Sequence, residues 1–247
     1  MGGLIAAFTF LTRLPVSPGW KPEEADFKHA AWYFPLIGLL LGFISVGVFN
    51  VFIRFLPGSM ALILTLGAGL LLTGALHEDG FADVADACGG MTQERRLEIM
   101  KDSRVGAFGV MALLFLFGFK FMAWQSLYVI SNQRLLAMLL LGPAWSRWIF
   151  LPLMAWIRPP AGHDGLGKSF TAPPWWGIAA WGIVLGLITW KLIPQQMAPV
   201  MIALICAGIG QGLFFRKWFG GLTGDCLGAA ALWVELSMLL AVCWGVS

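Results

Sequence analysis

Long runs of uncharged, apolar residues recur along almost the entire chain and restrict its fold more than any other feature. A helix needs about 20 such residues to cross the hydrocarbon core of a bilayer, which is roughly 30 Å thick. Seven runs approach that length: residues 30–53, 55–76, 105–129, 135–157, 173–190, 192–215 and 226–247. Three of them are interrupted by a single charge, at Lys120, Arg147 and Glu235 respectively. We therefore expect an all-α fold, a polytopic membrane helical bundle of about seven transmembrane helices that forms a single domain over residues 1–247.

The composition agrees with a membrane protein and excludes other classes. Charged residues make up 12% of the chain, whereas a soluble domain has about 25%. The net charge of +3 comes without a block of Lys or Arg, so no nucleic-acid partner is expected. The four cysteines show no C-x-x-C spacing, which argues against a zinc site. Residues 1–12 are apolar without a basic leader, and we interpret them as an interfacial segment.

The charges between the runs predict the sidedness. With the N-terminus on side one, eleven Lys and Arg residues fall on that side and three on the other. The positive-inside rule then makes side one, and with it the N-terminus, cytoplasmic. Twelve of the thirteen Asp and Glu residues fall on the same side. We therefore expect the polar chemistry at the cytoplasmic surface, in segments 10–28, 77–104, 158–172 and 216–225.

The stretch H-E-D-G-F-A-D-V-A-D-A-C-G-G at 77–90 is the most informative. On a helix, Asp79, Asp83 and Asp86 lie within roughly 60° of one another. Three carboxylates on one stripe repel unless a cation neutralises them. Oxygen-only ligands suit Mg²⁺ or Mn²⁺, and Glu78 and Asp102 are additional candidate ligands. The alternative is a solvated acidic loop whose small residues only pack helices.

His77 lies roughly 160° from Asp79 on the same helix. A catalytic role and a hydrogen-bonded interfacial histidine are therefore equally open for His77. Residues 91–104 are predicted to form a surface helix whose cations either clamp phosphate groups or anchor the segment at the membrane. Arg104 is the strongest phosphate-binding candidate among them.

A second polar motif, G-G-L-T-G-D-C-L-G-A at 220–229, opens the last apolar run. The amides of Gly221 and Gly224 can approach a phosphate, Thr223 adds a hydroxyl, and a helix N-terminus favours anions. Asp225 is a candidate metal ligand or general base, or else the helix N-cap.

Charges inside the apolar runs indicate pairing or function, because each costs about 2.5–3.5 kcal/mol at a helix centre. A mutual ion pair is the preferred interpretation for Glu235, and Arg147 either joins that pair or extends toward a phosphate. The segment G-L-G-K-S-F at 165–170 carries Lys168 but lacks the spacing of a P-loop.

Taken alone, these features describe a membrane enzyme that binds a polyanion through a divalent metal, as phosphoryl transfer requires. The chain also resembles the adenosylcobinamide-GDP ribazoletransferase, or cobalamin synthase, family nearly end to end. The similar stretches are F-L-T-R-L-P-V (10–16), F-P-L-I-G (34–38), H-E-D-G-F-A-D-V-A-D (77–86), R-R-L-E-I-M-K-D-S-R-V-G (95–106), G-L-G-K-S-F (165–170) and G-G-L-T-G-D-C-L-G-A (220–229).

The resemblance implies the final assembly of the nucleotide loop of vitamin B12, in the bacterial inner membrane. A hydroxyl of α-ribazole or of α-ribazole 5′-phosphate would attack the phosphate joined to cobinamide in adenosylcobinamide-GDP, and GMP would leave. Asp79, Asp83 and Asp86 would hold Mg²⁺, and Asp225 would be the base in preference to His77. Arg104, Lys168 and the 220–224 turn would bind phosphates. The oligomeric state stays open, a homodimer included.

Two rival functions are considered. A CDP-alcohol phosphotransferase performs related chemistry, but its D-x-x-D-G-x-x-A-R string is absent here, since Phe81, Ala82 and Asp83 follow Gly80. A membrane transporter usually places ionisable groups near the bilayer midplane, whereas here nearly all acids are expected at one surface.

Overall fold

The computed structural model describes residues 2–15, 23–160 and 170–244. Throughout these ranges the regular elements are helices, which confirms the all-α prediction. In chain order they are α1 (Gly2–Leu11), α2 (Glu24–Ala30), η1 (Ala31–Tyr33), α3 (Phe34–Phe52), α4 (Gly58–Thr73), α5 (Leu76–Ala87), α6 (Gln93–Ile99), α7 (Ala107–Ile130), α8 (Asn132–Trp148), α9 (Phe150–Trp156), α10 (Trp175–Leu192), η3 (Pro194–Gln196), α11 (Met197–Phe219) and α12 (Gly224–Cys243).

The expected membrane spans are confirmed, with one change in the second. Among the described residues, six continuous helical segments are long and apolar enough to cross a bilayer, and the bent pair α4–α5 makes a seventh if it is one span. The expected spans 30–53 and 135–157 correspond to helical segments Ala25–Phe52 and Asn132–Trp156. The 16 residues of α4 extend about 24 Å at 1.5 Å per residue, which is short for a crossing. The orientation relative to a membrane stays a prediction.

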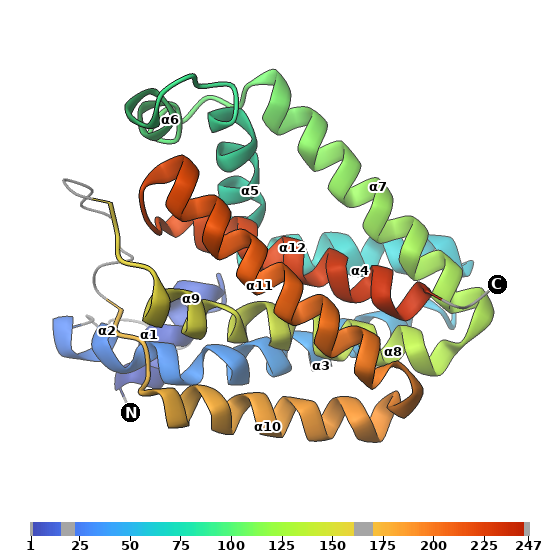
Figure 1. Cartoon of the computed structure of the whole chain (residues 1–247). Coiled ribbons are helices and arrows are strands. Elements are labelled where there is room, and N and C mark those ends of the chain that lie inside the picture. The colour runs from blue at the N-terminus through green and yellow to red at the C-terminus, as the bar shows by residue number, and fades with distance from the viewer. Residues whose placement is uncertain (1, 16–22, 161–169, 245–247) are drawn as a thin grey trace.

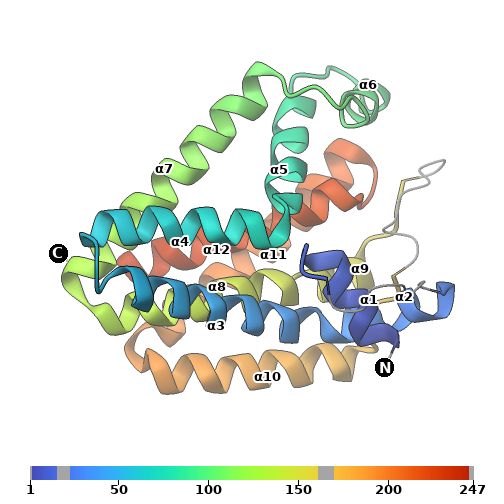
Figure 2. The ribbon, with the colours of Figure 1, turned by 180° about the vertical axis from the view of Figure 1, so that it is seen from behind.

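A bend of 90° separates α4 from α5 (Figure 2). Gly74 ends α4 in the left-handed region with φ +65°, and Ala75 follows with φ +55°. The Ala75 N–H donates to the Leu70 carbonyl at 3.1 Å, the six-to-one bond of a Schellman ending. Because α5 does not continue the direction of α4, we treat α4 as the crossing and α5 as a helix at the end of the bundle.

The helix α12 forms the centre of the bundle, and α8 packs beside it (Figure 1). Most of its residues, from Cys226 to Val242, are buried. On the neighbouring helix α3, Gly38 and Gly42 lie directly against the α8 backbone at Pro143 and Leu140. Small residues four positions apart allow such close packing of membrane helices. These contacts leave α5 and α6 at one end of the bundle and the C-terminus at the other.

Candidate active site

The aspartate-bearing helix α5 crosses the first turn of α12 in direct backbone contact. A Cβ atom at Gly80 would lie 2.8 Å from the Cα of Asp225, and a Cβ at Gly228 would lie 3.1 Å from the His77 carbonyl oxygen. Glycine is needed here because any side chain would separate the two helices. The crossing therefore brings Asp225 next to the aspartates of α5, as the sequence-based hypothesis requires.

Asp83 lies at the centre of this carboxylate group and is partly buried. Its pKa rises from 3.8 to about 7, first because burial disfavours the charged form, and then because Asp225, Asp79 and Asp86 repel it. All three of these repelling neighbours are carboxylates. The group thus concentrates negative charge. In the part of the chain that the structure describes, no salt bridge joins Asp79, Asp83 or Asp86 to a cation, whereas Asp225 has an interaction of its own.

Asp86 has a structural task in addition to its place on the stripe. Its carboxylate accepts hydrogen bonds from the Gly106 N–H at 2.7 Å and from the Gly109 N–H at 2.8 Å. Gly106 is the N-cap of α7, so Asp86 satisfies amides that the helix start would leave unpaired. Asp86 therefore fixes the start of α7 against α5.

The donor set fits a hard divalent cation in its chemistry, since the group consists of clustered carboxylates. Within residues 2–15, 23–160 and 170–244, however, no three His, Cys, Asp or Glu side chains converge closely enough to hold a metal ion. Metal binding by Asp79, Asp83 and Asp86 therefore stays a prediction that requires side-chain rotation.

The turn at 220–224 is mostly packed against protein. Thr223, not Asp225, is the N-cap of α12: its hydroxyl accepts from the Cys226 N–H at 3.2 Å. Thr223 is only 2% exposed, and Gly221 packs against the backbone of residues 158–160. Gly224 is exposed, with open space where a side chain would be. Of Gly221, Thr223 and Gly224, the turn residues proposed to bind phosphate by name, only Gly224 is exposed; Gly220 at the start of the turn is exposed too.

Asp102 and Arg104 pair with each other on the exposed surface. The Arg104 Nη2 donates to Asp102 Oδ2 at 2.7 Å, and this pairing lowers the pKa of Asp102 to about 2. The Arg104 side chain is 87% exposed, so it is accessible to a phosphate group. Lys168, the other proposed phosphate ligand, lies outside the described residues.

Three further candidates, two on α5 and one on α8, lie in the interior of the bundle, away from solvent. His77 is 3% exposed, stacks on Phe150 and accepts from the Arg147 Nη2 through Nδ1 at 3.3 Å. Arg147 pairs with Glu235 at 3.2 Å, which confirms the expected ion pair. Glu78 faces inward with Oε2 unpartnered among the described residues. The structure therefore separates His77, Arg147 and Glu78 from the carboxylate group.

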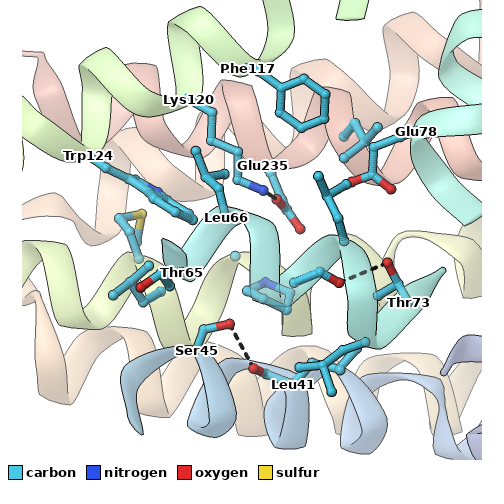
Figure 3. A pocket seen from close by; sticks show the side chains of 18 of the residues that line it. Leu41, Ser45, Thr65, Leu66, Thr73, Glu78, Phe117, Lys120, Trp124 and Glu235 are labelled. Atoms are coloured by element: carbon cyan, nitrogen blue, oxygen red, sulfur yellow. Dashed lines mark hydrogen bonds and ion pairs between the residues drawn. The ribbon is translucent and has the colours of Figure 1, made fainter. Parts of the chain in front are cut away.

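Lys120 completes this buried network, a role that the sequence analysis did not assign. Its Nζ lies 2.5 Å from Glu235 Oε2. Figure 3 shows the side chains of Glu78, Lys120 and Glu235 around a pocket that residues of α3, α4, α5, α7, α8 and α12 line. The volume of this pocket is about 60 Å³. That volume exceeds the roughly 10–15 Å³ that a cavity needs to hold one water molecule, so there is room for water. The bundle thus has a polar interior below the carboxylate group.

Arg13 is a second residue that the residue-by-residue analysis missed. Its side chain lies directly against Gly74 at the bend, and its N–H donates to the Leu72 carbonyl at 2.7 Å. The side chain is exposed beside Gly74, just before α5 begins at Leu76. The signal was present in the stretch F-L-T-R-L-P-V, which had contributed to the resemblance but was assigned no role.

Comparison with known proteins identifies the family. The family model described as cobalamin-5-phosphate synthase matches residues 3–243. The chain belongs to the cobalamin-5-phosphate synthase family. Both elements of the candidate site, α5 and the start of α12, lie inside the matched residues, so the geometry above belongs to the family's shared region.

Several relatives of this cobalamin-5-phosphate synthase family member carry the name adenosylcobinamide-GDP ribazoletransferase. The protein of Bradyrhizobium diazoefficiens is 37% identical over 95% of this chain and 90% of its own length. That of Ralstonia pickettii is 36% identical over 98% and 94%, and that of Chlorobaculum tepidum 35% over 99% and 96%. No solved structure matches the chain.

Proposed function

We propose that this chain joins α-ribazole, or α-ribazole 5′-phosphate, to adenosylcobinamide-GDP and releases GMP in an Mg²⁺-dependent reaction. Family membership and the shared name of the relatives support the substrates. The observation that carries the proposal is the crossing at Gly80, which places Asp225 beside the aspartate stripe. Phosphoryl transfer depends on positioning and electrostatic stabilisation, and this crossing holds the backbones that carry the carboxylates close together.

In atomic terms, a ribazole hydroxyl oxygen forms a bond to the phosphorus attached to cobinamide. The bond from that phosphorus to the pyrophosphate bridging oxygen breaks, and GMP leaves with the electron pair. We assign Asp225 as the base that accepts the hydroxyl proton, because it is partly exposed and adjacent to the stripe. His77 is buried on the inner face of α5, which makes it a poor candidate for contact with a substrate hydroxyl.

Asp79, Asp83 and Asp86 are the residues that would hold Mg²⁺, and Mg²⁺ when bound neutralises charge on phosphate oxygens. The chain's own contribution is to fix the carboxylates between α5, α7 and α12. Asp86 links α5 to α7 through the Gly106 and Gly109 amides. The exposed side chains of Arg13 and Arg104 and the open backbone at Gly224 are the proposed phosphate contacts.

We further propose that the site faces the cytoplasm of a bacterium from its inner membrane. The support is the excess of Lys and Arg on the side that carries α5, together with the positive-inside rule. The pyrophosphate of adenosylcobinamide-GDP is charged, which agrees with a site at the end of the bundle and not within it.

The decisive experiment incubates purified protein with adenosylcobinamide-GDP, α-ribazole and Mg²⁺. We expect GMP release that requires α-ribazole and stops on addition of EDTA. Replacing adenosylcobinamide-GDP by a CDP-alcohol should give no CMP. GMP release without α-ribazole would indicate simple hydrolysis, and CMP release or substrate flux into proteoliposomes without turnover would contradict the proposal.

A further inference from the structure

A deep apolar groove lies on the outside of the bundle between α8–α9, α10 and α11. Its volume is about 510 Å³, and Trp148, Leu153, Trp156, Ile205 and Ile209 are among the side chains that line it. Two glycines, Gly182 on α10 and Gly208 on α11, contribute to the lining. The groove is separate from the carboxylate group and from the internal polar cavity, which other residues line.

The length of the groove matches one leaflet of a bilayer. Its lining on α11 runs from Met201 to Ile209, which is about 12 Å at 1.5 Å per residue. Half of the hydrocarbon core of a bilayer measures about 15 Å. One acyl chain lying along α11 would therefore extend over the whole groove.

Positive charge lies at one end of the groove. The guanidinium of Arg216 is 5.8 Å from the ring centroid of Trp156, and Trp156 also lines the groove. Lys217 and Arg158 are exposed close by in the chain. In the described part of the chain, no carboxylate lies within salt-bridge distance of these three cations.

We propose that the groove binds one anionic phospholipid, with an acyl chain along α11 and the phosphate head group at Arg216. The apolar lining suits the acyl chain, because apolar groups within a bilayer associate through van der Waals packing against a complementary surface. The cations complement an anionic head group, and tryptophan at this position is typical of the membrane–water interface. The inference goes beyond the proposed function and does not depend on it.

The choice of lipid over a helix from a second copy follows from shape and charge. A second helix is 10–12 Å across with its side chains and would have to enter a groove that Gly208 and Ile149 help to line. A Cβ at Gly208 would already lie 3.0 Å from Ile149 Cδ1. Charge at a single end is also the pattern of a lipid, which has one polar terminus.

The test measures lipid binding by the full-length protein purified in detergent and stripped of lipid. Phosphatidylglycerol and phosphatidylcholine with the same acyl chains are added separately. Bound lipid per protein is determined by mass spectrometry, and the melting temperature is recorded in parallel. We expect saturable binding of one phosphatidylglycerol, with weaker binding of phosphatidylcholine.

Two substitutions with matched controls locate the site. Gly208→Leu places a large side chain in the groove and should weaken phosphatidylglycerol binding more than about tenfold. Gly210→Leu is its control and should not weaken binding, because Gly210 is exposed and has open space at its Cβ position. Arg216→Gln should weaken binding about fivefold, since one basic residue near an anionic head group contributes about 1 kcal/mol. Lys191→Gln, at the other end of the bundle, is its control.

The outcomes separate the alternatives. Equal binding of both lipids, unchanged in Gly208→Leu and Arg216→Gln, would overturn the proposal. A change in oligomeric state on Gly208→Leu with lipid binding unchanged would also overturn it and would identify a second copy as the occupant. If Gly208→Leu does not fold, the exposed Arg216→Gln variant still decides, and GMP release reports separately on the carboxylate group.

Discussion

Gly80 on α5 lies against the backbone of Asp225 on α12: a Cβ atom at residue 80 would be 2.8 Å from the Asp225 Cα and 2.9 Å from its carbonyl oxygen. Both neighbours are backbone atoms, so a side chain at residue 80 cannot be accommodated by rotating another side chain. The close approach of these two helices positions the candidate base relative to the aspartates of α5.

Gly80→Ala should therefore lower activity strongly while the protein stays folded. Moving α5 away from α12 displaces Asp225 from the stripe, and a misplacement of about 1 Å can cost about 100-fold in rate. The measurement is GMP release at saturating Mg²⁺. Gly67→Ala on α4 is the control, because nothing lies within 4 Å of its Cβ position. Equal activity of the two variants would show that the crossing does not position the site.

Asp83→Asn should abolish turnover and leave the fold intact. Asp83 has Asp79, Asp86 and Asp225 as repelling neighbours, so loss of its charge removes repulsion and should raise the melting temperature of the metal-free protein slightly. The measurements are GMP release and thermal unfolding in detergent. Glu94→Gln, an exposed carboxylate on α6, should change neither. Near-normal turnover of Asp83→Asn would remove the metal-binding assignment of α5.

Metal-free protein should lose stability as the pH rises from about 4 to about 7. The pKa of Asp83 is 3.8 in its ordinary state and about 7 in the fold, so the folded protein holds a proton that the unfolded chain releases. Stability falls with pH wherever the folded state binds more protons. The check is the melting temperature in EDTA at pH 5 and at pH 8.

Two comparisons isolate Asp83 in that experiment. In Asp83→Asn the decrease in melting temperature between pH 5 and pH 8 should be smaller. Added Mg²⁺ should stabilise the wild-type protein more at pH 8 than at pH 5, because cation and proton compete for the same carboxylates. An identical pH profile in wild-type protein and Asp83→Asn would contradict the raised pKa.

The membrane spans could be predicted because crossing a bilayer depends on local properties, namely length and apolar character. The aspartate stripe could be predicted for the same reason, since helical spacing alone puts Asp79, Asp83 and Asp86 on one face. The bend at Gly74 and Ala75 was not predicted. The apolar run 55–76 continues through it, and a positive φ at Ala75 depends on tertiary contacts and not on alanine's own preference.

The capping contacts and the partner of Lys120 could not be predicted from the sequence either. Thr223 and Asp225 are both good N-cap residues, and only the register of α12 decides for Thr223. Asp86 caps α7, twenty residues away in the chain, because α7 starts beside α5 in space. Lys120 was visible as a charge within an apolar run, but its contact with Glu235 joins residues 115 positions apart.

Glu235→Gln should destabilise the protein more than any single exposed charge change. Glu235 accepts from both Lys120 and Arg147 inside the bundle, and its removal leaves two buried cations without their carboxylate. Breaking a buried pair in this way costs about 3–5 kcal/mol, which corresponds to roughly 10 °C in melting temperature for a chain of this size. Thermal unfolding in detergent measures the effect.

Glu98→Gln is the matched control, since it makes the same Glu-to-Gln change in an ion pair with a similar N–O distance. Arg95 and Glu98 lie 3.0 Å apart with both side chains about two-thirds exposed, and exposed pairs contribute about 0–1 kcal/mol. The double variant Lys120→Met, Glu235→Gln should recover part of the lost stability, because one unpaired cation is removed with its partner. Equal melting temperatures for Glu235→Gln and Glu98→Gln would contradict this prediction. They would mean that water in the cavity beside Glu78 stabilises Lys120 and Arg147 to the same extent as the Glu235 carboxylate.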